Sequence, residues 1–468
     1  MYIDTEALNG LRGLLTAGIV TPMTPPPHAA ALVPDRSGRR VLMARQPDGR
    51  LALPSAQCEE DTDLTGKVVQ ALRRRWGIVA PFLRSPAKTR RGHTPALWLC
   101  AYEPAHGKPP QGLEWADIDL VAAQTGLPDE LAAAAAAWRD EQRSGETPPR
   151  RAPWARLGWF DTMRAWVTQQ LEQRGIDTVA EPEILQQWGI SAVYRQATSR
   201  GDYYFKAVFG SPGRGFWHEP KVTLALADAH GARVTPVAAI DSDRGWMLMP
   251  DMGLAKCLSE ADEAAQVSGL VDLARIQREW MSRTGELESL GCPDRSPHAL
   301  RRRLPELIDD ALHRTGLTEE ESAQLRSHTQ RLYETCDRAS GDPIPLTLMH
   351  GDFHTGNVGV RADGTVCIFD WSDATVGHPF WDTDIYLKTA KPQAGDRLRD
   401  AYLQSWSDHA SRPVLRQSFD DALVLAAVNQ VISYAAIVAE LEDSDRTFSN
   451  GKQHWWRQAL EAMRRQAW

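Results

Sequence analysis

The sequence predicts a two-domain protein of α/β and α+β class. We expect an N-terminal α/β sandwich, then a bilobal domain with a β-rich small lobe and a mainly helical large lobe. Short alternating strands with turn signals fill the first part, a Pro-, Gly- and charge-rich stretch at 144–153 reads as a linker, and helical periodicity dominates the rest. The predicted boundaries are 1–145 for the first domain, 154–252 for the small lobe with an N-terminal helix, and 253–468 for the large lobe.

Length and composition exclude several classes of function. A chain of 468 residues that is 42% hydrophobic can bury more than one core. Its net charge is -8, and basic residues form no continuous stripe in the sequence. We therefore expect no binding to nucleic acid or to an anionic membrane surface. The same mild acidity slightly favours neutral or cationic substrates. The sequence indicates no oligomeric state.

The cysteines and the apolar runs predict a cytoplasmic protein. The six cysteines lie far apart, without Cys-x-x-Cys or zinc-ligand spacing, which fits a reducing compartment. Acidic Asp4 and Glu6 stand where a secretory signal would be basic. Polar residues interrupt the longest apolar run, Ala422 to Ala439, so we expect a buried helix there and no membrane partner.

The first domain is expected to begin with a strand, a turn, a strand and a helix. Arg40 to Arg45 and Leu51 to Pro54 are strand-like and flank the turn Pro47-Asp48-Gly49. Helical periodicity runs from about Leu64 to Arg75, and an alanine-rich helix is expected from about Asp129 to Gln142.

This order of elements resembles a Nudix domain, whose box contains a Gly, a helix rich in Arg and Glu, and a closing Gly followed by an aliphatic residue. If Gly77 and Ile78 close the box, then Arg74 and Arg75 stand at the family's paired metal-binding glutamates, and Ala56 stands at its first Gly. Two guanidinium groups would repel the Mg²⁺ that such a hydrolase needs. The resemblance therefore implies a Nudix-like domain without hydrolase activity.

Two other groups of charged residues near this helix have alternative explanations. Glu59, Glu60 and Asp61 could supply metal ligands, but they precede the helix, where a solvated loop is the commoner explanation. Arg73 to Arg75 could bind an anionic ligand, but an exposed basic helix face is the commoner explanation for such residues.

The small lobe is predicted from a second set of alternating runs. A helix marked by Trp159, Met163 and Leu171 comes first. Strands are expected at Ile190 to Ala197 and at Tyr203 to Phe209, which carries Lys206.

The densest group of polar residues lies between Leu348 and Leu387. Asp352 and Asn357 precede one short strand, Asp363-Gly364 gives a strong hairpin signal, and Asp370 follows the returning strand. The hairpin should therefore bring three oxygen-bearing side chains together. Phosphoryl transfer needs such a group, with a carboxylate near the attacking hydroxyl and hard oxygen ligands that hold Mg²⁺ against nucleotide phosphates.

This segment resembles the catalytic and metal loops of the aminoglycoside phosphotransferase and choline kinase family, small-molecule kinases with a protein-kinase-like fold. The resemblance rests on His-x-Asp-x4-Asn beginning at His350, on Ile-x-Asp-Trp, and on Gly-x-Pro-x2-Asp ending at Asp382. It implies that Asp352 is the catalytic base and that Asn357 and Asp370 are Mg²⁺ ligands. Asp382 would support the catalytic loop through hydrogen bonds.

The same resemblance implies a nucleotide site in the small lobe. Lys206 would contact the phosphates, and Glu219, beside a Pro in a first helical turn, would orient Lys206. Backbone amides around Ser191 are candidates for a phosphate cradle, and Met249 lies in the expected adenine-binding hinge strand. Taken singly, Lys206 could be an edge charge of a strand and Glu219 an ordinary helix-start residue.

Departures from the protein-kinase pattern favour a small-molecule acceptor. Gly351 replaces the Arg of His-Arg-Asp, Asp370-Trp371-Ser372 replaces Asp-Phe-Gly, and no Ala-Pro-Glu follows. We therefore do not expect regulation by loop phosphorylation. Four residues near the catalytic loop in sequence are candidates for contact with the acceptor, although no motif supports them: His354, Trp371, Asp373 and Trp381. The alternatives are that the two tryptophans are packing residues and that Asp373 is an ordinary loop acid.

The sequence thus predicts an Mg²⁺-dependent enzyme that transfers phosphate from ATP, or another nucleoside triphosphate, to a small hydroxylated substrate. Aminoglycosides, amino alcohols, hydroxy amino acids and sugars all remain open as acceptors. The alternative is a nucleotide-binding regulatory or sensor protein with degenerate catalytic domains. The intact set of Asp352, Asn357, Asp370 and Lys206 counts against that alternative.

Overall fold

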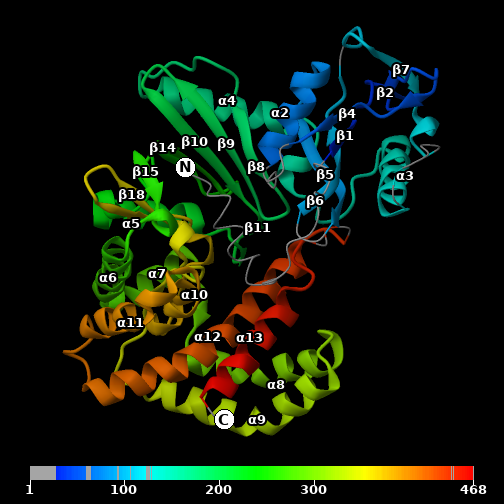
Figure 1. Ribbon diagram of the computed structural model, residues 1–468. Coiled ribbons are helices and arrows are strands. Elements are labelled where there is room, and N and C mark those ends of the chain that lie inside the picture. Colours follow the sequence, from blue (N-terminus) through cyan, green and yellow to red (C-terminus); the bar gives the residue numbers. More distant parts are fainter. Residues whose placement is uncertain are drawn as a thin grey trace. The chain divides into compact units, whose positions relative to one another are not determined.

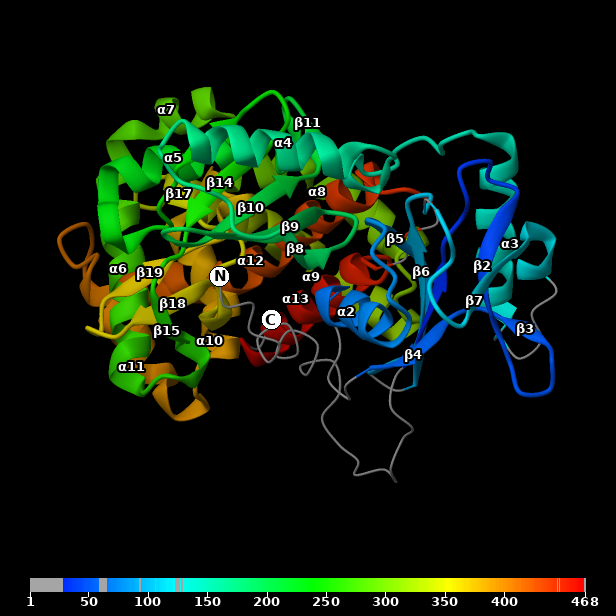
Figure 2. The same ribbon diagram turned by 90° about the horizontal axis from the view of Figure 1, so that it is seen from above.

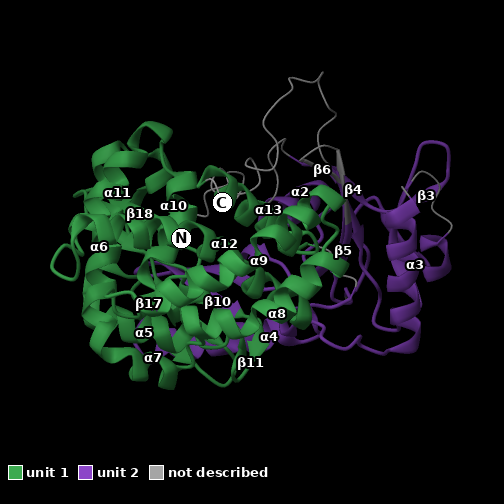
Figure 3. Ribbon diagram, turned by 90° about the horizontal axis from the view of Figure 1, so that it is seen from below, with its two compact units in different colours: residues 1–11, 208–440, 446–468 green, residues 12–207, 441–445 purple. Residues whose placement is uncertain are grey.

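The computed structural model describes residues 28–58, 65–91, 94–105, 107–122, 127, 129–443, 445 and 447–466. The chain divides into two compact units (Figure 3). Unit 2 contains residues 12–207 together with Leu441–Asp445, and unit 1 contains the remainder. These two units are compact parts of the chain and do not test where its domains begin and end. The predicted domain boundaries therefore stay predictions.

The first part of unit 2 holds two small sheets. One has the strand order β4-β1-β6-β5, with β1 parallel to β6 and antiparallel to β4, and the other has the order β3-β2-β7. The interior residues of β1 and β2 are continuously buried, as expected for strands covered on both faces. The strands are β1 (His28–Leu32), β2 (Arg40–Arg45), β3 (Leu51–Ala52), β4 (Ser55–Gln57), β5 (Phe82–Arg91), β6 (Thr94–Tyr102) and β7 (Leu113–Asp117) (Figure 1).

Two helices accompany these sheets, at the positions that the sequence predicts. They are α2 (Thr65–Trp76) and α3 (Asp129–Ser144). Helix α3 buries Leu131, Ala135 and Trp138 on one face, the spacing of an amphipathic helix. On α2 the side chains of Arg73 to Arg75 are exposed, which favours the basic helix face over a ligand site. Glu59, Glu60 and Asp61 lie outside the described residues.

Helix α2 packs directly against β8, the first strand after the predicted linker. Thr65 Oγ1 hydrogen-bonds Gln186 Oε1 at 3.0 Å and donates to Gln187 O at 2.9 Å. A Cβ at Gly66 would lie 2.3 Å from Ile184 O, so only glycine allows this close approach. Unit 2 continues through α4 (Trp159–Glu172), β8 (Glu183–Gln187), β9 (Ser191–Thr198) and β10 (Gly201–Val208), with β9 between β8 and β10.

A buried arginine from the predicted linker joins three distant parts of unit 2. Arg151 is only 4% exposed. It donates to both carboxylate oxygens of Glu141 in α3 at 2.8 Å, and its Nε donates to Glu442 Oε2 at 2.5 Å. The segment Leu441–Asp445 also packs on the turn between β8 and β9, where a Cβ at Gly189 would lie 2.4 Å from Asp445 Oδ2. A segment from near the end of the chain therefore completes this unit.

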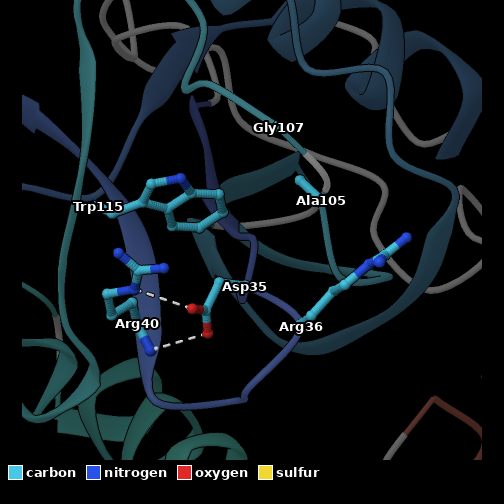
Figure 4. Close-up of a pocket in the computed structure, with 6 residues that line it drawn as sticks. All are labelled: Asp35, Arg36, Arg40, Ala105, Gly107 and Trp115. Carbon is cyan, nitrogen blue, oxygen red and sulfur yellow. Dashed lines mark hydrogen bonds and ion pairs between the residues drawn. The ribbon is translucent and has the colours of Figure 1, made fainter.

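Unit 2 also contains a polar hollow of about 400 Å³, shown in Figure 4. The guanidinium of Arg40 lies 5.9 Å from the centroid of the Trp115 ring, and Arg40 Nε donates to Asp35 Oδ2 at 2.9 Å. No residue predicted to take part in phosphoryl transfer lines it. Its lining consists of Asp35, Arg36, Arg40, Ala105, Gly107 and Trp115.

Unit 1 begins with short strands and one helix, then becomes mainly helical, as the sequence predicts. The first elements are β11 (Gly210–Ser211), β12 (Arg214–Gly215), α5 (Glu219–His230), β13 (Ala239–Asp241), β14 (Trp246–Pro250) and β15 (Leu254–Cys257). The later helices are α6 (Glu263–Trp280), α7 (Thr284–Leu290), α8 (Pro297–Arg314), α9 (Glu319–Ser340), α10 (Thr383–Thr389), α11 (Gly395–Gln404), α12 (Arg412–Glu440) and α13 (Gly451–Arg465).

Two three-stranded sheets lie among these helices (Figure 2). One has the order β15-β18-β19, and the other has the order β16-β20-β17. Their strands carry or flank the polar residues of the predicted catalytic segment. The strands are β16 (Asp294–Arg295), β17 (Thr347–Met349), β18 (Val358–Arg361), β19 (Val366–Ile368) and β20 (Thr375–Gly377).

Helix α12 is the apolar helix that the sequence predicts in this region. By length and composition alone it could cross a membrane, since its most apolar window has a mean hydropathy of 2.0. However, 61% of that window is buried inside the protein, as in a core helix, and α13 runs beside it (Figure 1). Fully buried Trp371, Trp406 and Trp456 belong to the same large core.

Candidate active site

The hairpin of β18 and β19 positions the polar residues as predicted. The two strands pair antiparallel across the Asp363-Gly364 turn, and Phe369 N donates to Asn357 O at 3.0 Å. Asn357 ends the loop before β18, and Asp370 follows Phe369 on the return. The hairpin therefore holds Asn357 and Asp370 at the same end, which confirms the predicted local geometry.

Asp352 lies in the loop that leads into this hairpin. Asn357 Nδ2 donates to Asp352 O at 2.9 Å, which ties the loop to the hairpin. The Asp352 side chain is 37% exposed, and His354 Nε2 lies 3.7 Å from its Oδ2. Desolvation raises the pKa of Asp352, His354 opposes this shift, and the charge of Asp370 adds to it. Asp352 and Asp370 thus interact electrostatically within one site.

The oxygen donors beside Asp352 fit Mg²⁺. Carboxylate and amide oxygens are the ligands that Mg²⁺ prefers, and Asp370 and Asn357 offer one of each. Because Asn357 Nδ2 is engaged with a carbonyl, its Oδ1 is the atom suited to a metal. Asp370 adopts a left-handed backbone conformation with φ 64°, which is rare outside glycine and concentrates at functional sites. Among the described residues, His, Cys, Asp and Glu side chains form no group of three that could hold a metal ion.

Asp382 makes the hydrogen bonds to the catalytic loop that the sequence predicts. It accepts from His350 N at 2.8 Å, from Gly351 N at 2.9 Å and from Gln277 Nε2 at 3.0 Å. Tyr402 OH in turn donates to Gln277 Oε1 at 2.6 Å. Burial raises the pKa of Asp382 to about 7, although these hydrogen bonds favour its ionised form. Asp382 thereby holds two backbone amides of the loop, while Gln277 and Tyr402 hold Asp382 in turn.

Steric crowding explains why glycine occupies position 351. Gly351 has φ 82°, and a Cβ there would lie 2.1 Å from the backbone oxygen of Asp373. Gln430 Nε2 in α12 also donates to Gly351 O. No other residue, including the Arg of protein kinases, fits at this position without displacing the loop.

The predicted nucleotide-binding residues are buried but belong to different units. Lys206 in β10 is 5% exposed, and Ser191 at the start of β9 accepts from Trp188 Nε1 at 2.7 Å; both belong to unit 2. Glu219 at the start of α5 and Met249 in β14 are buried in unit 1, which also holds Asp352, Asn357 and Asp370. The functional roles of all these residues stay predictions.

Helix α5 contacts the segment that follows Asp370. His218, directly before Glu219, is buried, and its Nε2 has no hydrogen-bond partner among the described residues. Burial lowers the pKa of His218 to about 4, and the backbone of Ala374 opposes the shift only partly. The neutral imidazole is therefore part of the folded state.

This burial predicts an acid-sensitive contribution to stability. Because the folded-state pKa of His218 lies below the unfolded value, its contribution is complete above pH 6.5 and is lost as the pH falls from 6.5 towards 4. The loss should approach roughly 3 kcal/mol of unfolding free energy. Chemical denaturation of the parent and of His218→Gln at pH 7.5 and pH 4.5 measures it. Equal acid losses in the two proteins would contradict this assignment.

Several residues of the site carry no sequence signal. Gln277 and Tyr402 come from α6 and α11, and Gln430 comes from α12. Arg295, whose charge opposes the raised pKa of Asp373, comes from β16. None belongs to a motif. Gln277 and Gln430 each lie within an apolar helical run. A glutamine in such a run weakly indicates that its side chain forms a buried hydrogen bond.

The comparison with protein families decides the family. The model of the phosphotransferase enzyme family (APH) matches residues 184–417, half of the chain. The chain belongs to the phosphotransferase enzyme family. The match includes the catalytic segment and the strands of the predicted small lobe, and it confirms the resemblance for this part of the chain. It begins after the N-terminal part, so the Nudix-like resemblance stays a prediction.

Among solved structures, those similar to this chain include three phosphotransferases. A choline/ethanolamine kinase family protein from Mesorhizobium loti is 15% identical, with 65% of this chain and 94% of that chain covered and a TM-score of 0.46. A macrolide 2'-phosphotransferase type I is also 15% identical, with 63% and 96% covered and a TM-score of 0.44. A GDP complex of an aminoglycoside 2'-phosphotransferase is 14% identical, with 64% and 98% covered and a TM-score of 0.45. The curated proteins contain no match.

Proposed function

We propose that this member of the phosphotransferase enzyme family transfers the terminal phosphoryl group of ATP, or of another nucleoside triphosphate, to a hydroxyl group of a small molecule. The grouping of Asp352 with Asn357 and Asp370 at one end of a hairpin carries the proposal. A protein that only binds nucleotide has no need of a carboxylate placed beside two metal-ligand oxygens.

Each residue has a defined part in the proposed reaction. The acceptor oxygen attacks the terminal phosphorus, the bond from that phosphorus to the bridging oxygen breaks, and the hydroxyl proton passes to Asp352. Asn357 and Asp370 would hold Mg²⁺, which when bound offsets negative charge on the phosphate oxygens. Lys206 would contact the nucleotide phosphates, with Glu219 orienting it. Asp382 keeps the loop in position, so that little rearrangement is needed on reaction.

The test is nucleotide turnover by the full-length protein. With ATP or GTP, Mg²⁺ and a panel of hydroxylated metabolites, at least one metabolite should increase nucleoside diphosphate formation well above the rate with water alone. Removal of Mg²⁺ by EDTA should stop the reaction. Nucleotide binding without turnover for any metabolite would favour the regulatory alternative, and no nucleotide binding would exclude both functions.

For the N-terminal part we propose a Nudix-like domain without hydrolase activity. Arg74 and Arg75, which align with the metal-binding glutamates of that family, are exposed on α2 and offer no oxygen ligand. The full-length protein should therefore release no phosphate or nucleoside monophosphate from ADP-ribose or dinucleoside polyphosphates with Mg²⁺ or Mn²⁺. The Asp352→Asn variant should be used, so that the other site gives no background. Metal-dependent hydrolysis would refute this proposal.

A further inference from the structure

Arg295 has a half-buried side chain that forms no ion pair within 4.0 Å among the described residues, and its charge acts on Asp373 of the candidate active site. It lies in β16, which pairs in parallel with β20, a few residues beyond Asp370 in the chain. Nη1 of Arg295 is buried and has no hydrogen-bond partner in the part of the chain that the structure describes. Burial and the charge of Arg303 lower the pKa of Arg295 to about 10, and Asp373 and Asp294 oppose this shift only in part. A buried, unpaired charge of this kind is costly, so a bound anion would be stabilising.

Asp373 presents the opposite charge beside the catalytic base. Its backbone packs against Gly351, the residue directly before Asp352. Desolvation and then the charges of Asp352 and Asp370 raise the pKa of Asp373, and Arg295 acts against them. No hydrogen bond or ion pair within 4.0 Å involves the Asp373 carboxylate among the described residues, so Arg295 and Asp373 interact across a gap wider than an ion pair.

An aromatic side chain completes this group of residues. Burial raises the pKa of Tyr434 in α12, and the charges of Asp352 and Asp373 add to this shift. Its ring is fixed between Gly451, where a Cβ would lie 1.8 Å from a ring carbon, and Trp455, whose ring centroid is 6.3 Å away. The catalytic base, a second acid, an unpaired guanidinium and a rigid aromatic ring therefore all belong to unit 1.

We propose that the phosphate acceptor is a zwitterion, a hydroxyl-bearing amino acid, whose carboxylate binds Arg295 and whose ammonium group binds Asp373 while its hydroxyl faces Asp352. The inference rests on the proposed function and assigns the substrate class of that site. A guanidinium binds a carboxylate through two parallel hydrogen bonds, which gives orientation as well as affinity. An acceptor with only an amine would leave Arg295 unpaired, and one with only a carboxylate would leave the acids beside Asp352 uncompensated.

Matched acceptors test the substrate class directly. L-Serine, ethanolamine and 3-hydroxypropionate differ only by the carboxylate or the amine, and so do L-homoserine, 3-amino-1-propanol and 4-hydroxybutyrate. L-Threonine and 5-hydroxy-L-lysine extend the series. With MgATP and the full-length protein, at least one amino acid should be phosphorylated, with kcat/KM at least roughly tenfold above its amine-only and acid-only analogues, the scale of one charged hydrogen bond.

Variants test the role of Arg295. Arg295→Met keeps much of the side-chain volume and should raise KM for the amino acid roughly 10- to 100-fold, with kcat within a few-fold of the parent. Arg295→Lys keeps the charge but loses the paired hydrogen bonds. Its KM should therefore lie between those of the parent and of Arg295→Met. Arg303→Met removes the neighbouring exposed arginine and should leave KM within about twofold of the parent, because surface charges contribute little. Melting temperature and MgATP affinity serve as controls for folding.

The outcomes separate this inference from the proposed function. Phosphorylation of an amino alcohol, sugar or aminoglycoside in preference to every amino acid would overturn the zwitterion and leave the phosphotransferase standing. An unchanged KM in folded Arg295→Met would overturn the role of Arg295. A protein that hydrolyses MgATP slowly but phosphorylates none of the amino acids would also overturn the inference, whereas failure to bind any nucleotide would overturn the proposed function itself. If Arg295→Met does not fold, Arg295→Lys and the matched acceptors still decide.

Discussion

Replacing Asp352 by Asn should reduce kcat by about 10²-fold or more while MgATP affinity stays within a few-fold of the parent. The change keeps the size of the side chain but removes the carboxylate that accepts the hydroxyl proton, and loss of a general base has an effect on this scale. The backbone carbonyl of residue 352, which holds Asn357, is untouched. Single-turnover phosphate transfer beside calorimetric titration with MgATP separates the two quantities.

Asp370→Asn should fail in a different way. An amide replaces a charged metal ligand, so Mg²⁺-dependent nucleotide binding should weaken together with turnover. Asn tolerates the left-handed conformation found at position 370, so the effect should not come from backbone strain. Asp363→Asn in the same hairpin is the matched control, because Asp363 is exposed and accepts a hydrogen bond from Thr365 N in its own turn, away from the candidate site. Undiminished transfer by Asp352→Asn would leave the proposed mechanism without its base.

Gly351→Ala should have the second largest effect, on both stability and activity. The added methyl group would lie 2.1 Å from Asp373 O, a backbone atom that cannot move away as a side chain could. Relief requires the catalytic loop to shift, and a displacement of about 1 Å at reacting groups can cost roughly 10²-fold in rate. We expect turnover to fall on this scale, with a loss of unfolding free energy measurable by chemical denaturation.

Gly364→Ala provides the control for this substitution. Gly364 also has a positive φ, 84°, but a Cβ there meets nothing within 4 Å. Gly364→Ala should lower the free energy of unfolding only by the conformational strain, roughly 1–2 kcal/mol, and should leave turnover close to that of the parent. Gly351→Ala should exceed this loss by roughly 1–3 kcal/mol, because crowding adds to strain. Equal losses in the two variants would show that crowding against Asp373 is unimportant.

The sequence predicts those parts of the fold that are specified locally. Helices such as α3 and α12 follow from apolar residues at helical spacing, and the hairpin that carries Asp370 follows from one Asp-Gly turn between short apolar runs. Each of these patterns involves residues that are close together in the sequence. They can therefore be recognised from one sequence alone.

The remainder of the candidate site depends on contacts between distant residues. Asp382 and Gln277, more than a hundred positions apart, meet in one hydrogen bond, and neither residue alone indicates the other. The same holds for Arg295 and Asp373, whose charges act on each other although they form no ion pair among the described residues, and β16 of Arg295 aligns in parallel with β20 shortly after Asp373. The linker provides a third case, because the sequence places Arg151 in a linker, whereas in the structure Arg151 is buried and binds two carboxylates. Partners of this kind arise from packing, which periodicity does not encode.

The burial of Arg151 between Glu141 and Glu442 has a consequence for how the protein is made. During synthesis Glu442 follows Arg151 after 291 residues, a delay of tens of seconds at ordinary translation rates. Until then the guanidinium has only half of its native counter-charge, and the turn at Gly189 lacks the segment that packs on it. Unit 2 should therefore reach its final protease resistance only after residues 441–445 have left the ribosome, although domains that emerge first commonly fold first. Ribosome-bound chains in which this segment is absent or still inside the ribosome should resist limited proteolysis less than the released chain.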